Sequence, residues 1–152
     1  MIWLVDTNVL LRLTEIGSDH HSAARNAVEK LLADDISLSI VLQNVSEYWN
    51  VCTRPTANNG LGFTIAQADA ELTKIESVFD LIPDTTEVYR QFRRLIVEHS
   101  VSGVKVHDAK IVAAMKTHGI LNLLTFNTKR LQTLRRQRRR TWRRLKIGNT
   151  RR

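Results

Sequence analysis

The chain has 152 residues and a formal net charge of +8, but the charge is very unevenly distributed. Residues 1–127 carry 11 Lys or Arg and all 15 Asp or Glu, a net charge of −4, whereas residues 128–152 carry 12 Lys or Arg and no acid. The total charge therefore does not identify the whole chain as a basic nucleic-acid-binding domain. We predict one mildly acidic domain of ordinary size over residues 1–127 and a basic, Arg-rich tail over residues 128–152.

Cysteine content and hydropathy indicate the compartment. Cys52 is the only cysteine, which excludes an internal disulfide and a Cys-rich zinc site and fits a reducing environment. The apolar N-terminus is interrupted at Asp6 and lacks the basic start of a signal peptide, and no stretch approaches membrane-spanning length. We therefore expect a cytoplasmic protein without a membrane partner.

Short apolar runs alternate with segments of helical periodicity along the first 125 residues. In chain order, the pattern predicts a strand at 2–5, helices at 7–15 and 20–33, a strand at 36–40, helices at 42–53 and 64–77, a strand at 78–82, helices at 86–99 and 107–117, and a strand at 120–125, with loops at 58–62 and 101–106. This alternation predicts an α/β fold with a parallel sheet covered by helices on both faces. Sites in such folds form beyond the carboxyl ends of the strands.

Three acidic side chains occupy positions that can converge at that edge. Asp6 follows the first strand, Glu47 lies in the helix after the second, and Asp108 opens the helix before the fourth. Carboxylates brought together repel one another unless a cation neutralises them. Oxygen-only ligands suit Mg²⁺ or Mn²⁺, and such a site supports metal-activated water attacking a phosphodiester.

Each acid also has a simpler interpretation when taken alone. Asp6 could cap a helix, Glu47 could be an exposed helical residue, and the helix dipole alone favours Asp108 at a helix start. Glu47, however, stands beside Tyr48 and Trp49 near the apolar stripe of its helix, where a carboxylate needs a partner. The three acids together, more than any one of them, indicate a metal site.

Four sequence blocks, in order and at fitting separations, resemble a known family. DTNVLL (6–11), SEYWNV (46–51), VHDAKIVAAM (106–115) and LLTFNTK (123–129) are similar to PIN-domain nucleases, and most of all to VapC-type ribonuclease toxins of bacterial toxin–antitoxin systems. The resemblance covers residues 1–129. It implies a three-layer fold with a five-stranded parallel sheet, metal-dependent endonucleolytic cleavage of RNA, a cognate antitoxin as partner, and a homodimer.

The resemblance also implies roles for particular residues. The catalytic and metal-binding carboxylates, for Mg²⁺ or Mn²⁺, would be Asp6, Glu47 and Asp108, and the supporting residues would be Thr7, Asn8, Thr125 and Asn127. Independently of the family, weaker candidates for RNA contact are Lys105, His107, Arg93 and Arg94. A solvated helix face explains the arginines without RNA, and a loop lysine and a helix-start histidine need no such role.

The sequence departs from the family pattern after the fourth strand. Family members usually carry a fourth acid there, but Asn127 and Arg130 occupy its two usual positions. Asn127 can still ligate through its carbonyl oxygen without adding charge, whereas a cation at position 130 would oppose metal binding. The residues that follow lack a strand pattern, so we expect the fifth strand to be missing or altered. The alternative function is a catalytically impaired RNA-binding relic of the same fold.

A one-base frameshift from about residue 129 would account for this departure. With one choice of codons, reading residues 129–135 one base later restores an Asp-Phe pair, and residues 136–142 then give Gly-Asn-Val-Val-Val-Pro-Gly, a strand followed by proline. The hypothesis fails if the DNA codons cannot give Asp-Phe in that frame. The tail is also compatible with an Arg-rich segment that contacts RNA phosphates, or with a disordered extension that binds polyanions nonspecifically.

Overall fold

The computed structural model describes residues 1–127. The basic tail, the expected alteration of the fifth strand and the frameshift hypothesis all concern residues outside this range. Within residues 1–127, no helix is long and apolar enough to cross a membrane.

The predicted strands and helices are all present, with ends that differ from the predicted ones by at most two residues. In chain order the elements are β1 (Ile2–Val5), α1 (Thr7–Thr14), α2 (His21–Ala33), β2 (Ser37–Val41), α3 (Leu42–Thr53), the short 3₁₀ helix η1 (Thr56–Asn58), α4 (Ile65–Glu76), β3 (Asp80–Ile82), α5 (Thr86–Glu98), α6 (Lys105–Thr117) and β4 (Asn122–Leu124). The 3₁₀ turn η1 was not predicted.

The described strands form a parallel sheet in the order β3-β2-β1-β4, which confirms the predicted fold class. The chain builds outward from β1 through β2 to β3 and then returns to place β4 on the other side of β1. Val5 is in register with Leu124, so the carboxyl ends of β1 and β4 lie side by side. Ligands of open α/β sheets bind where the strand order reverses in this way.

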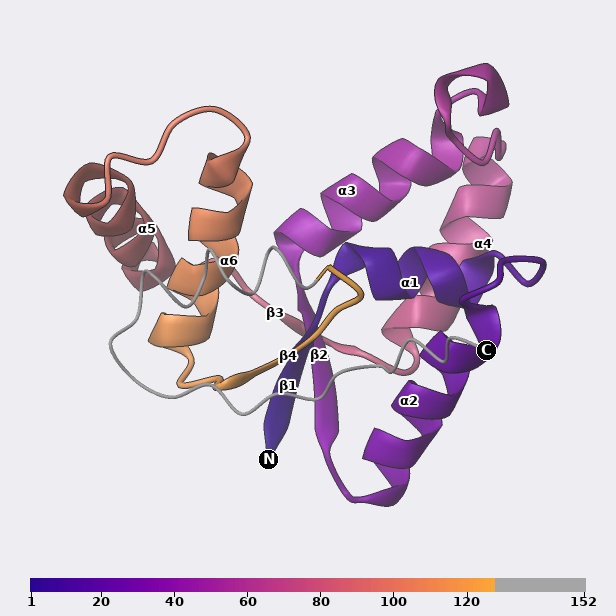
Figure 1. Ribbon diagram of the computed structural model, residues 1–152, viewed down its shortest axis with the longest axis horizontal. Helices are drawn as coiled ribbons and strands as arrows, with labels where there is room; N and C mark the ends of the chain where they lie inside the picture. The colour runs from indigo at the N-terminus through magenta and orange to yellow at the C-terminus, as the bar shows by residue number, and fades with distance from the viewer. Residues whose placement is uncertain (128–152) are drawn as a thin grey trace.

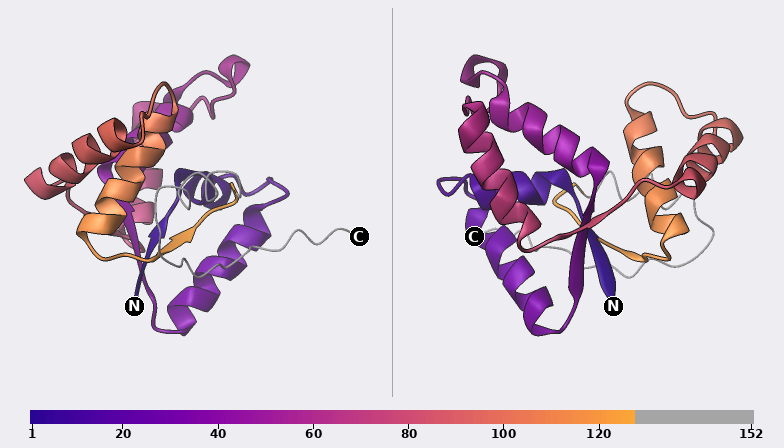
Figure 2. Two further views of the ribbon diagram at one scale, coloured as in Figure 1. Left: turned by 60° about the vertical axis from the view of Figure 1, so that its left-hand side comes forward. Right: turned by 180° about the vertical axis from the view of Figure 1, so that it is seen from behind.

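Helices cover both faces of this sheet. Figures 1 and 2 show α5 and α6 on one side and α1, α2 and α4 on the other. The alternation of side chains along β1 divides the core accordingly: Trp3 and Val5 pack with residues of α1 to α4, whereas Leu4 packs with residues of α5 and α6. Each such buried side chain contributes roughly 1.5–3 kcal/mol. Both faces of the sheet are thus packed with apolar side chains. The residues just beyond the carboxyl ends of β1 and β4, Asp6 and Thr125, are polar.

The start of α6 differs from the prediction. The loop expected to extend through residue 106 ends earlier, and α6 begins at Lys105. Gly103 has a φ of 58°, a left-handed conformation that glycine adopts without strain. Its carbonyl accepts a hydrogen bond from the Val106 amide at 3.1 Å, which closes the turn into α6. Lys105 and His107 are therefore helical residues, and Asp108 lies within the first turn instead of opening the helix.

Candidate active site

Asp6 is a buried carboxylate at the end of β1. It occupies the N-cap position of α1, but its side chain makes no capping hydrogen bond, so capping does not explain it. Its exposed fraction is only 2%. Its Oδ2 atom accepts hydrogen bonds from Asn8 Nδ2 at 2.9 Å and from Thr125 Oγ1 at 2.6 Å. A buried charge needs donors of this kind, and they hold the carboxylate in one orientation.

The Thr125 hydroxyl joins the residues that follow β1 to those that follow β4. It donates to Asp6 and accepts from Asn8 Nδ2 and from the Asn127 amide, both at 3.0 Å. Asn8 Oδ1 in turn accepts from the Phe126 amide at 3.1 Å. A hydroxyl offers one donor and two acceptor positions, and here all three are used. Residues 125–127 are thereby fixed against residues 6–8.

Glu47 is a half-buried carboxylate on α3, held at both oxygens. Oε2 accepts from Thr7 Oγ1 at 2.8 Å, and Oε1 accepts from Gln43 Nε2 at 2.7 Å. Thr7 Oγ1 accepts from Asn44 Nδ2 at 3.1 Å, and Asn44 Oδ1 accepts from the Val41 amide at 2.9 Å. Asn44 is fully buried, so it both caps α3 and orients the hydroxyl that reaches Glu47. These contacts exclude the simple interpretation of Glu47 as a solvated helical residue.

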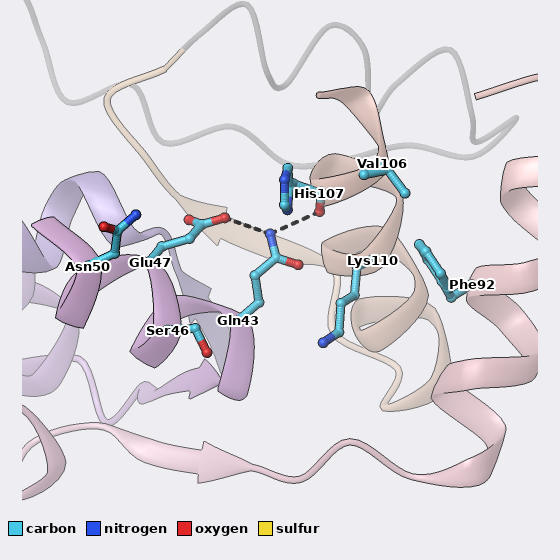
Figure 3. A pocket seen from close by; sticks show the side chains of 8 residues that line it. All are labelled: Gln43, Ser46, Glu47, Asn50, Phe92, Val106, His107 and Lys110. Carbon is cyan, nitrogen blue, oxygen red and sulfur yellow. Dashed lines mark hydrogen bonds between the residues drawn. The ribbon is translucent and has the colours of Figure 1, made fainter. Parts of the chain in front are cut away.

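Two adjoining clefts meet at Glu47. The first is an open cleft of about 390 Å³, and the residues that line it include Asp6, Thr7, Asn8, Glu47 and Asn127. The second, of about 460 Å³, lies between α3 and α6 and shares Glu47 and Asn50 with the first. Figure 3 shows Glu47 on one side of this second cleft and Lys110 with Phe92 on the other. Glu47 thus belongs to the wall between them.

Asp108 is the expected carboxylate that the structure does not bring to these clefts. It is half-buried in the first turn of α6 and lines neither of them. Among residues 1–127, no group of three or more His, Cys, Asp or Glu side chains lies close enough to hold a metal ion. Asp6, Glu47 and the Asn127 side chain nevertheless give the first cleft an oxygen-rich lining of the kind that Mg²⁺ and Mn²⁺ prefer. The donor types at the cleft therefore suit a hard divalent cation, with two carboxylates at the cleft, while the third expected carboxylate, Asp108, stands on the neighbouring helix.

The weaker candidates for RNA contact are divided between α5 and α6. Lys105 and His107 are exposed in the first turn of α6, and His107 lines the second cleft. Arg93 and Arg94 are exposed on α5 and line neither cleft beside Glu47. Arg94 is paired with Glu98 on its own helix at 3.7 Å. This geometry favours a solvated helix face for the arginines.

Gln43 and Asn44 were not among the predicted site residues. Gln43 precedes Glu47 by four residues, so the two side chains share one helix face, and this spacing is the one local sign that the sequence offers. The Asn44–Thr7 pair joins positions 37 residues apart. No local pattern marks such a contact, because it depends on how α3 packs beside α1.

Comparisons with known proteins agree with this geometry. The family model described as PIN domain matches residues 3–136. No curated protein sequence matches the chain. One similar solved structure is VapBC2 from Rickettsia felis, bound to a DNA fragment from its promoter, with a TM-score of 0.65 and 18% sequence identity over 88% of this chain and 92% of that chain. A second is VapC20 from Mycobacterium tuberculosis, a sarcin–ricin loop cleaving toxin, with a TM-score of 0.62 and 21% identity over 88% of this chain and 95% of that chain. A third is VapBC-1 from nontypeable Haemophilus influenzae, with a TM-score of 0.61 and 12% identity over 90% of this chain and 94% of that chain. At these identities the likeness is one of fold.

Proposed function

Because the chain belongs to the PIN-domain family, we propose that it is a metal-dependent endoribonuclease, the toxin of a type II toxin–antitoxin pair. The observation that carries this proposal is the pair of carboxylates, Asp6 and Glu47, each held by its own donors on the wall of one open cleft. The fold shared with VapC20, a toxin that cleaves the sarcin–ricin loop, supports RNA as the substrate. A cognate antitoxin, a second copy of the chain and a cytoplasmic location complete the proposal.

The chemistry assigns distinct tasks to the residues of the cleft. Asp6 and Glu47, with the side-chain carbonyl of Asn127, would hold Mg²⁺ or Mn²⁺ at the first cleft, and Asp108, on the neighbouring helix α6, is the third proposed ligand. When bound, such a cation polarises a water molecule and the phosphate oxygens for hydrolysis of a phosphodiester. Asn8 and Thr125 keep the Asp6 carboxylate in place. Thr7 does the same for one oxygen of Glu47. Groups locked before substrate arrives lower the cost of reaching a reactive geometry.

The test is cleavage of RNA by the purified chain with Mg²⁺ or Mn²⁺, compared with the same reaction in EDTA. Asp6→Asn keeps the volume of the side chain and removes its charge, and it should abolish cleavage. The exposed Asp19, outside the cleft, provides a control, since Asp19→Asn should cleave as the unaltered protein does. Cleavage that persists in EDTA or in Asp6→Asn would refute the proposal.

A catalytically impaired, RNA-binding relic is the second candidate. The observation that favours it is Asn127, which lines the cleft where the family usually has a fourth acid. An impaired protein would bind RNA in a filter-binding assay and yet show no metal-dependent cleavage. If cleavage appears only after the reading frame beyond residue 129 is restored, the present chain is a damaged copy.

A further inference from the structure

Gln43 is a buried side chain that lies between a candidate metal ligand and a neighbouring helix. Its exposed fraction is 6%. Its Nε2 atom donates to Glu47 Oε1 at 2.7 Å and to the backbone carbonyl of His107 on α6 at 3.2 Å, as Figure 3 shows. Both partners can only accept from it, so a flipped carboxamide would set its oxygen against two oxygens. The hydrogen bonds therefore determine which way the carboxamide faces.

This orientation leaves the other end of the carboxamide unsatisfied. Within the described part of the chain, Gln43 Oε1 is buried and has no hydrogen-bond partner. A buried acceptor without a partner costs folding free energy. The His107 carbonyl lies inside α6, where an amide one turn later is its ordinary partner, so it does not depend on Gln43. This penalty offsets much of what the hydrogen bond to Glu47 contributes, so a gain in stability is a weak reason for a glutamine here.

Glu47 is the group that gains from this arrangement. Its side chain has three rotatable bonds, and Thr7 holds only Oε2. With that contact alone, the carboxylate could still turn about the direction of the Thr7 bond. Gln43 removes this freedom by holding Oε1, and it ties the same carboxylate to the first turn of α6, which carries Asp108.

We propose that Gln43 is a positioning residue for the metal site: it fixes the Glu47 carboxylate and sets its placement relative to Asp108. This inference rests on the proposed function, because it assigns Gln43 to the site that would hold the cation. Side chains that orient metal ligands typically change metal affinity by about 10- to 100-fold when they are removed. The loss should appear in metal binding even when the fold is intact.

The test is Gln43→Met, which keeps the length of the side chain and removes its donor. Binding of Mn²⁺ is measured by titration calorimetry, and the melting temperature is measured without metal. We expect the affinity for Mn²⁺ to fall by about 10- to 100-fold, with a melting temperature close to that of the unaltered protein, because the lost bond to Glu47 and the removed unsatisfied oxygen roughly offset each other. Cleavage should recover in part at high Mn²⁺ concentration. Gln43→Leu provides a second variant should the methionine not fold.

A matched control exists on α5. Gln91 Nε2 donates to Glu87 Oε1 at 3.1 Å with the same four-residue separation, away from both clefts, so Gln91→Met should leave Mn²⁺ binding unchanged. Equal Mn²⁺ affinity in Gln43→Met and the unaltered protein overturns the positioning role alone. A marked drop in the metal-free melting temperature of both Gln43 variants, together with the affinity loss, shows a structural role and also overturns it. If the unaltered protein binds no Mn²⁺, the proposed function fails first, and this inference fails with it.

Discussion

Replacing Thr125 with valine tests whether one buried hydroxyl holds the carboxyl edge of the sheet together. Valine has nearly the same shape, and Thr125 is only 4% exposed, so the substitution removes hydrogen bonds without opening a cavity. The three bonds lost are the one to Asp6 and those from Asn8 and the Asn127 amide. The Thr125→Val variant therefore isolates the hydrogen bonding of this hydroxyl from its packing.

The expected cost follows from the partners. A bond to a buried carboxylate contributes about 1.5–3 kcal/mol, and each neutral bond about 0.5–1.5 kcal/mol. Asn127 is exposed, so water can satisfy its amide, and Asn8 still donates to Asp6. We therefore expect the free energy of unfolding to fall by about 2–4 kcal/mol, somewhat less than the sum of the three bonds.

The assay is urea unfolding followed by tryptophan fluorescence at neutral pH. Thr125→Ser keeps the hydroxyl and should lie within about 1.5 kcal/mol of the unaltered protein, because only one methyl group is lost. A double-mutant cycle with Asn8→Ala should show a coupling energy of about 0.5–3 kcal/mol. If Thr125→Val costs less than about 1 kcal/mol, comparable to a single neutral hydrogen bond, the hydroxyl does not organise this edge as described.

Three further predictions concern the rest of the domain. Burial raises the pKa of the Tyr48 phenol above its ordinary value of 10.0, so as the pH rises the unfolded chain loses this proton before the folded protein does. The free energy of unfolding should therefore not depend on this phenol below about pH 10 and should fall above that pH. In urea titrations at several pH values, Tyr48→Phe should show a smaller fall. Leu4 is fully buried, and Leu4→Ala should cost about 2–5 kcal/mol in the same assay, so a loss below about 1 kcal/mol would contradict the burial. The Thr64 hydroxyl caps α4 by accepting from the Gln67 amide at 3.2 Å, and Thr64→Ala should cost about 1 kcal/mol by thermal unfolding while Thr64→Ser does not.

The fold was largely predictable because its elements have strong local patterns. The apolar run of β1 and the helical spacing of α2 and α3 are visible without tertiary context. The start of α6 was not, because residues 104–106 show no helical period and the helix begins where Gly103 allows the chain to turn. The turn η1 was missed because it is a single short turn, closed by the bonds from the Asn58 amide to the Pro55 carbonyl and from the Asn59 amide to the Thr56 carbonyl, and so short a segment has no helical period.

The candidate site was predictable only in part. Asp6 and Asn127 could be expected at one edge, because each comes just past a predicted strand, and both line the first cleft. The hydrogen bond from Thr125 to Asp6 was not predictable in this way, because the predicted fourth strand extended through Thr125. Sequence position could not show that Asp108 would stand outside the cleft of Asp6, since that depends on how α6 lies against the sheet. The contact of Gln43 with α6 spans 64 residues and leaves no trace in the sequence.

The hydrogen bond between Asp6 and Thr125 joins positions 119 residues apart, which has a consequence for synthesis. During synthesis, Asp6 therefore leaves the ribosome long before Thr125 does. Contacts between such distant positions form late, because the intervening chain must first be ordered. A nascent chain that stops short of β4 therefore exposes Asp6 without the strand and the hydroxyl that hold it. For the proposed nuclease, the Asp6 carboxylate would reach its fixed orientation only after β4 has joined the sheet beside β1.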